Sequence, residues 1–180
     1  MRLQPLTNAQ GETAEMPFSA KKEEAAPLQP HFLHAGQVFV AGDGTPIALI
    51  LGSCVGVCIW DGLNGIGGAV HYMLPAWDGK GSQSARYGDV GISILLQKLT
   101  QAGAIRGNLR AKVFGGGCLF DLLREVNTGK GQHIGRRNVD VATEILGKAH
   151  VPVVLMDVGL SRGQRVSFRT DNGETAMKVL

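Results

Sequence analysis

The 180-residue sequence contains no apolar run that approaches the eighteen or so residues needed to cross a lipid bilayer. Its N-terminus also lacks the charged start and apolar core of a secretory signal peptide. Both absences predict a cytoplasmic protein that does not insert into a membrane. The chain has an ample apolar content for one folded domain, since 44% of its residues are hydrophobic.

The sequence also has a small net charge and few cysteines. The formal net charge is only +3 and the 18 basic residues are spread along the chain, so no nucleic-acid partner is expected. The three cysteines form an odd number, unlike the disulfide framework of a secreted protein. Cys54 and Cys58 would lie about 13 Å apart on an extended strand, too far for a disulfide. Neither a Cys-x-x-Cys pair nor paired histidines occur, so we expect no metal and no cofactor.

Aromatic residues make up only 6% of the chain, whereas glycine occurs 26 times, which favours many short strands and tight turns. Apolar patterning predicts strands at 36–40, 45–51, 55–60, 66–74, 109–114, 151–156, 165–169 and 174–179. Apolar spacing of three and four residues predicts helices at 87–102, 118–126 and 134–148. Residues 1–34 show no sustained period and are predicted to be a flexible tail, so 35–180 would be a single α+β domain.

Two segments carry residues suited to catalysis. Gly52-Ser53-Cys54 interrupts an apolar run, which predicts a thiol at a bend that a substrate carbonyl can approach. His71 follows seventeen positions later, in the strand predicted at 66–74. Adjacent strands lie about 5 Å apart, so the two side chains can come within hydrogen-bonding range. The thiol needs such a base, because a pKa near 8.5 leaves little thiolate at neutral pH. From spacing alone, two ordinary core residues are the alternative.

Further segments follow in a fixed order: Arg86-Tyr87-Gly88-Asp89, 111–117, Ile134-Gly135-Arg136-Arg137-Asn138, Asp157 and Ser161-Arg162-Gly163. Together with 51–58 and 67–75 they resemble the CheD family, the chemoreceptor glutamine deamidases of bacterial chemotaxis, over roughly residues 35–180. The resemblance implies that Cys54 is the nucleophile and His71 its base in converting receptor glutamines to glutamates with release of ammonia. It also implies a layered α/β/β/α architecture of packed, mainly antiparallel sheets, related to bacterial toxin deamidases.

The resemblance names the partners as well. The cytoplasmic domains of chemoreceptors would be the substrate, and the phosphatase CheC is a candidate second partner. An alternative function is a regulatory binding module that engages CheC or receptors with little catalysis. A cysteine peptidase would use the same chemistry on a backbone amide, and is a third hypothesis.

Other residues are candidates for secondary roles. The N–H of Cys54 is the natural oxyanion donor, and Gly52 and Ser53 are expected to line the approach of the substrate. Arg136 and Asn138 are candidates for substrate binding. The three glycines at 115–117 either form a nest of N–H groups for an anion or a turn where backbones crowd together, and we favour the turn.

One feature departs from the family pattern. Members of the family usually carry a threonine five or six residues before the cysteine, which is thought to orient the histidine. Here those positions hold Leu49 and Ala48, whose side chains cannot form a hydrogen bond. We therefore expect another acceptor, a backbone carbonyl or a side-chain oxygen, within about 3.2 Å of an imidazole nitrogen of His71.

Overall fold

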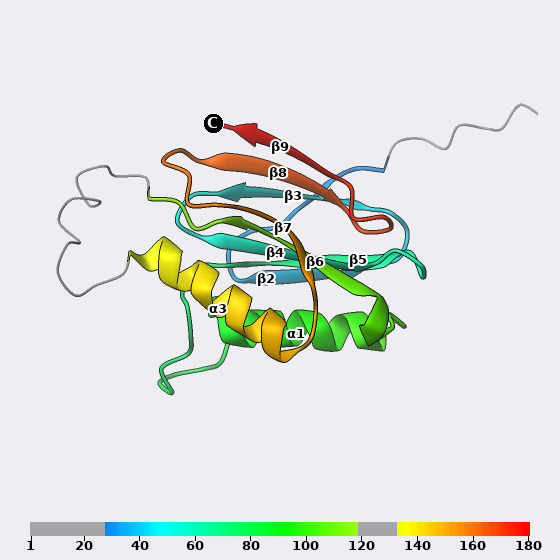
Figure 1. Ribbon diagram of the computed structural model, residues 1–180, viewed down its shortest axis with the longest axis horizontal. Helices are drawn as coiled ribbons and strands as arrows, with labels where there is room; N and C mark the ends of the chain where they lie inside the picture. Colours follow the sequence, from blue (N-terminus) through cyan, green and yellow to red (C-terminus); the bar gives the residue numbers. More distant parts are fainter. Residues whose placement is uncertain (1–27, 119–132) are drawn as a thin grey trace, which may run out of the picture.

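The computed structural model describes residues 28–118 and 133–180. Two β-sheets lie face to face, and two helices cover the free side of one of them (Figure 1). The four-stranded sheet has the order β1 (His31–Phe32), β3 (Pro46–Leu51), β8 (Gln164–Arg169), β9 (Thr175–Val179). The five-stranded sheet has the order β2 (Gln37–Ala41), β5 (Ile66–Tyr72), β4 (Val55–Asp61), β6 (Leu109–Gly115), β7 (Val153–Val158). The helices are α1 (Gly88–Gln101) and α3 (Ile134–Lys148), and a 3₁₀ turn, Arg106–Asn108, precedes β6.

The sheets confirm the predicted α+β class. Most neighbouring strands are antiparallel, and the parallel pairs are β1 with β3 and β6 with β7. Each predicted strand is found with boundaries shifted by a few residues at most, including the C-terminal hairpin of β8 and β9. Two predicted helices correspond to α1 and α3, and the third, at 118–126, lies outside the described residues except for Cys118.

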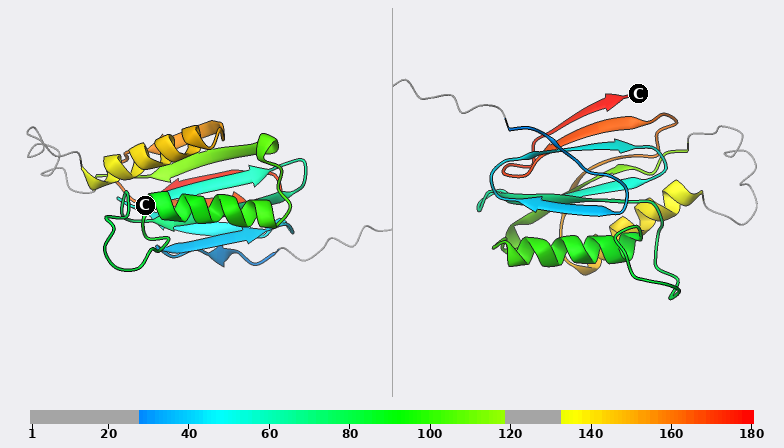
Figure 2. Two further views of the ribbon diagram at one scale, coloured as in Figure 1. Left: turned by 90° about the horizontal axis from the view of Figure 1, so that it is seen from below. Right: turned by 180° about the vertical axis from the view of Figure 1, so that it is seen from behind.

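Both described helices pack on the five-stranded sheet, as the views from below and behind also show (Figure 2). Among residues 28–118 and 133–180, no helix covers the outer face of the four-stranded sheet, so the second helical layer that the resemblance implied is not observed there. Exposed Arg165 and Arg169 lie on this outer face opposite Ile50 and Pro46. A sheet face with such charged side chains can meet water directly and needs no covering layer. Neither described helix is long and apolar enough to span a membrane.

Two apolar cores stabilise these layers. The core between the five-stranded sheet and the helices includes the α1 side chains Ile92, Leu95 and Leu99. The core between the two sheets consists of Leu33, Ile47, Leu49, Leu51, Cys58, Ala69, Phe114, Val166 and Phe168. Strand β4 is buried on both faces because it contributes to both cores.

Strand β1 corrects the predicted start of the domain. The sequence assigned residues 1–34 to a tail, but His31 and Phe32 pair with β3, and Leu33 is only 3% exposed. A strand of two residues is too short to show an apolar period, which is why the sequence did not reveal it. The folded domain therefore begins at or before His31 instead of residue 35, and residues 1–27 lie outside the described part of the chain.

Candidate active site

The Cys54 bend and His71 lie at the same end of two neighbouring strands. Cys54 stands between β3 and β4, and its side chain is partly exposed. The first residue of β4, Val55, pairs with Tyr72 of β5, and Gly56 pairs with His71. The register therefore places the bend beside the end of the histidine strand, but no hydrogen bond joins Cys54 and His71 in this structure.

The register also shows which way His71 faces. Paired residues share a sheet face, and a Cβ at its partner Gly56 would lie 3.0 Å from Leu49 Cδ2 in the opposite sheet. His71 therefore faces the space between the sheets, as does Leu49, which is 1% exposed. Because side chains alternate along a strand, Ala48 faces outward with Ile50, which is 59% exposed. Relatives usually carry a threonine at position 48 or 49, and of these two positions only 49 faces the histidine.

A main-chain oxygen holds the His71 imidazole. Its Nδ1 lies 3.0 Å from the carbonyl oxygen of Leu33. Because a carbonyl oxygen only accepts, Nδ1 carries the proton and Nε2 has the free lone pair. Leu33 is fixed in turn, since its N–H donates to the carbonyl oxygen of Ala48 at 2.9 Å. The predicted substitute acceptor is confirmed.

The surroundings keep His71 neutral. Burial lowers the pKa of His71 below 6.5, the Leu33 hydrogen bond raises the pKa in part, and the charge of nearby His34 lowers it. Nε2 is buried and has no hydrogen-bond partner among the described residues. A neutral imidazole with an unoccupied Nε2 lone pair can act as a general base.

The three cysteines differ in their environments. Burial raises the pKa of the Cys54 thiol, and the N–H of the same residue partly offsets this rise. Cys58, fully buried in β4, has a pKa that burial raises much further. Cys118 is 8% exposed. Cys54 is thus the accessible thiol of the described residues, and it depends on a base to become a nucleophile.

N–H groups of the glycine segment 115–117 donate to the carbonyl oxygens of the bend. The N–H of Gly117 donates to the Gly52 oxygen and the N–H of Gly116 to the Cys54 oxygen, both at 2.8 Å. A Cβ at Gly115, whose φ is +93°, would lie 2.2 Å from the Cys54 oxygen, so a side chain there would collide with the bend. The 115–117 segment is therefore the predicted crowded turn. Two of its N–H groups bind protein carbonyls and are not available to an anion.

The two residues expected to bind substrate differ sharply. Asn138 is fully buried in α3, and its Nδ2 donates to the carbonyl oxygens of Ser53 and Met73, both at 3.1 Å. This burial contradicts a direct contact with substrate. Arg136 is exposed and pairs with Asp140 one turn along the helix at 3.0 Å. Its side chain bonds to Asp140 and not to the bend, so a contact with substrate stays a prediction.

Sequence reasoning missed one acceptor that the site uses and one buried tyrosine that supports the neighbouring helix. Leu33 acts through its main chain, which no side-chain pattern reveals. Tyr72 lies in a buried strand, and its hydroxyl donates to the Asn138 carbonyl oxygen at 2.6 Å. The signal available was its position directly after His71 in a buried strand. Among residues 28–118 and 133–180, no group of three or more His, Cys, Asp or Glu side chains could hold a metal ion.

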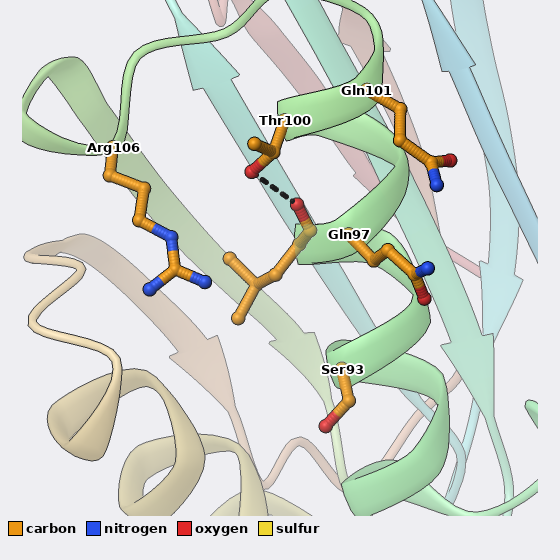
Figure 3. Close-up of a pocket in the computed structure, with 6 residues that line it drawn as sticks. Ser93, Gln97, Thr100, Gln101 and Arg106 are labelled. Atoms are coloured by element: carbon orange, nitrogen blue, oxygen red, sulfur yellow. Dashed lines mark hydrogen bonds between the residues drawn. The ribbon is translucent and has the colours of Figure 1, made fainter.

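A surface groove runs along the solvent side of α1, well removed from this chemistry. Figure 3 shows part of its lining, in which Thr100 lies on the side of α1 that faces Arg106, whereas the amides of Gln97 and Gln101 point away from Arg106. Ser93 and Leu96 also line the groove. The start of α1, at Gly88, packs against Tyr72 at the end of β5. Gly103, just after the end of α1, lies near Ile66 at the start of β5. The groove thus lies toward the strand end opposite His71.

Comparison with known proteins adds the family. A family model described as CheD chemotactic sensory transduction matches residues 73–179. The "Probable chemoreceptor glutamine deamidase CheD 1" of Anaeromyxobacter dehalogenans is 39% identical over 149 residues, which cover 83% of this chain and 84% of that protein. The chain belongs to the CheD family. The "Probable chemoreceptor glutamine deamidase CheD" of Sulfurimonas denitrificans is a further CheD relative, 34% identical over 83% of this chain and 93% of its own.

Solved structures give a weaker likeness to this CheD-family chain. The Neisseria meningitidis protein NMB0706 has a TM-score of 0.46 and 15% identity over 83% of this chain and 74% of its own. The Bacillus licheniformis hypothetical protein YfiH has a TM-score of 0.45 and 15% identity over 69% and 51%. The CheD model match begins at Met73, so Cys54 and His71 precede it, and their roles depend on the site geometry.

Proposed function

We propose that this CheD-family chain is a protein-glutamine deamidase that acts on the cytoplasmic domains of chemoreceptors, with Cys54 as nucleophile and His71 as base. The observation that carries the proposal is the state of His71. Its Nδ1 is bound to the Leu33 oxygen and its Nε2 is unoccupied, at the same strand end as the accessible thiol. The relatives, described as probable chemoreceptor glutamine deamidases, supply the substrate class.

In the first half of the reaction, Nε2 of His71 takes the Cys54 proton while the sulfur attacks the side-chain carbonyl carbon of a glutamine. The N–H of Cys54 donates to the oxyanion, and the bend at Gly52 and Ser53 leaves room for the substrate. The imidazolium then returns its proton to the amide nitrogen. The C–N bond breaks, ammonia leaves and a thioester remains.

In the second half, His71 takes a proton from water and the hydroxide attacks the thioester. The oxyanion forms again at the same N–H donor and collapses, which breaks the C–S bond. His71 returns the proton to the sulfur, so the thiol and imidazole are restored. The net change is glutamine plus water to glutamate plus ammonia.

The first test is intact-mass analysis of a chemoreceptor signalling fragment after incubation with the protein. Each deamidation replaces NH₂ with OH and adds about one mass unit. We expect stepwise gains with the parent and with Cys58→Ser, since Cys58 is buried away from solvent. We expect none with Cys54→Ser. Unchanged mass with the parent, or equal gains with Cys54→Ser, contradicts the proposal, and cleaved fragments would indicate a peptidase.

The binding-module hypothesis now has less in its favour. It drew on the missing threonine, but Leu33 supplies the acceptor that the threonine would have provided. CheC stays a candidate partner of the deamidase. A parent that binds CheC or a receptor fragment tightly and never changes the mass of the fragment would favour the binding module over the enzyme.

A further inference from the structure

Asn138 links three parts of the candidate site. Its Nδ2 donates to the Ser53 oxygen in the bend and to the Met73 oxygen just beyond β5, both at 3.1 Å. Its own main-chain oxygen accepts from the Tyr72 hydroxyl at 2.6 Å. One buried amide on α3 therefore ties the nucleophile bend to the strand that carries His71.

The bond from Asn138 to the Ser53 oxygen also fixes the orientation of the Ser53–Cys54 peptide group. In a trans peptide the C=O and the following N–H point in opposite directions. Because the Ser53 oxygen points toward α3, the N–H of Cys54 points away from α3. That N–H also lies near the Cys54 sulfur, where it partly offsets the rise of the thiol pKa. The donor and the nucleophile thus share one side of the bend, which is where a tetrahedral oxyanion would form.

Packing alone does not account for an asparagine at this position. The side chain is 0% exposed, and its Oδ1 is buried with no hydrogen-bond partner among the described residues. An apolar side chain of similar size would remove the unpaired Oδ1 but would leave the Ser53 and Met73 oxygens without this donor, so the two bonds account for the asparagine. The carbonyl oxygens of Gly52 and Cys54, on either side of Ser53, accept from glycine N–H groups. The Ser53 oxygen between them accepts from the side chain of Asn138.

We propose that Asn138 is a positioning residue that sets the Ser53–Cys54 peptide, and with it the Cys54 N–H, as the oxyanion donor of the reaction. This inference rests on the proposed deamidase function. The oxyanion forms in both halves of the reaction, so a misdirected donor slows both. The position of the sulfur, and its access to His71, do not depend on the direction of this N–H, although the thiol pKa does.

The experiment separates the donor from the thiol. Asn138→Leu keeps a similar volume without a donor, and Asn138→Ala removes the side chain. For folded variants we expect kcat for the receptor fragment to fall about 100-fold or more, with KM changed by about threefold at most. Iodoacetamide alkylates the sulfur by direct displacement and forms no oxyanion. We therefore expect the alkylation rate of Cys54 to match the parent at alkaline pH, where the thiol is ionised in both proteins, and the pH profile to shift upward because the N–H no longer favours the thiolate.

Tyr72→Phe is the matched control. It removes the bond to the main chain of Asn138 and leaves the side-chain amide in place. We expect a lower melting temperature and a kcat within about threefold of the parent, because the donor is still set. A kcat loss in Tyr72→Phe as large as in Asn138→Leu would overturn the inference, since helix docking would then explain both.

Other outcomes are also decisive. A folded Asn138→Leu with parental kcat overturns the inference alone, provided that the parent deamidates the fragment. Equal losses of kcat and alkylation rate overturn it too, because the thiol would have moved. A parent without deamidation overturns the proposed function and this inference together. If neither apolar variant folds, Asn138→Ser keeps one hydroxyl donor for one carbonyl, and an intermediate kcat supports the inference whereas a parental kcat overturns it.

Discussion

Leu33 orients His71 through its main-chain oxygen, so a substitution of the Leu33 side chain does not remove the acceptor. At the scale of single residues, the site thus depends on atoms that every residue type provides. The same holds for the N–H groups of Gly116 and Gly117 that bind the bend, although there only glycine avoids a collision.

Restoring the threonine gives a residue-scale prediction. We expect neither Ala48→Thr nor Leu49→Thr to raise the deamidation rate. Ala48 faces away from the inter-sheet space, and Nδ1 of His71 already has its acceptor when position 49 changes. Leu49→Thr should also cost about 1–3 kcal/mol of unfolding free energy, because it places a hydroxyl in an apolar core. Steady-state rates and urea unfolding of both variants provide the measurement, and a faster variant would show that the Leu33 bond does not suffice.

The proposed role of His71 as the base predicts how activity depends on pH. The base is active only when neutral, and burial lowers its pKa below the ordinary value of 6.5. We therefore expect kcat/KM to stay high as the pH falls to about 6.5 and to decline below it, as His71 gains a proton. Rates from pH 5 to 9 test this. A decline that already begins above about pH 7 would contradict a neutral buried imidazole.

Residue type and spacing made Cys54 and His71 candidates, with two ordinary core residues as the alternative, and the family resemblance assigned their roles. It could not predict that Asn138 would be buried, because a polar residue near a helix start is usually exposed. It also could not identify Leu33, because a main-chain acceptor has no preferred residue type.

At the scale of elements, β1 is the main difference between sequence and structure. Its two residues pair with β3 in parallel, and the pairing is visible only once β3 has been placed in three dimensions. The longer strands and helices were predictable because their periodicity extends over five residues or more. The face that each helix covers was not, since periodicity gives the apolar side of a helix but does not say which sheet it meets.

Truncation tests the contribution of β1. A chain that begins at Ala35 lacks β1, the buried Leu33 side chain and the acceptor of His71, whereas one that begins at Leu28 keeps all three. We expect the Ala35 chain to melt at least about 5 °C lower, since burial of a leucine contributes about 1.5–3 kcal/mol. We also expect its kcat to fall at least about tenfold, because orientation of the base is lost. Equal melting and equal kcat in the two chains would show that β1 is dispensable.

At the scale of the whole molecule, Asp61 stabilises the end of β4 opposite the Cys54 bend. Its carboxylate accepts hydrogen bonds from the N–H groups of Leu63 and Ile105 at 3.0 and 2.9 Å, and from the Asn64 amide at 2.7 Å. Burial alone would raise the Asp61 pKa, but these bonds outweigh it and lower the pKa to about 2. The carboxylate therefore links the end of β4 to the turn at residues 63–64 and to the segment at Ile105.

Asp61 predicts how stability depends on acid. A lowered pKa contributes stability above the unfolded value of about 3.9, and this contribution is lost as the pH falls from about 4 to 2. We expect Asp61→Asn to lower the unfolding free energy at pH 7 by about 2 kcal/mol and to flatten this acid dependence. The kcat of the folded variant should not change. Exposed Asp78→Asn is the control, and we expect it to stay within about 0.5 kcal/mol of the parent.

The Leu33 contact also bears on how relatives are judged from alignments. An alignment column records side chains, and a backbone oxygen leaves no mark in it. A protein that has exchanged a threonine hydroxyl for a main-chain acceptor therefore looks, column by column, like one that has lost its catalytic apparatus. Sorting such sequences into active and degenerate members requires asking whether a strand passes beside the histidine, which is a property of chain tracing and not of residue identity.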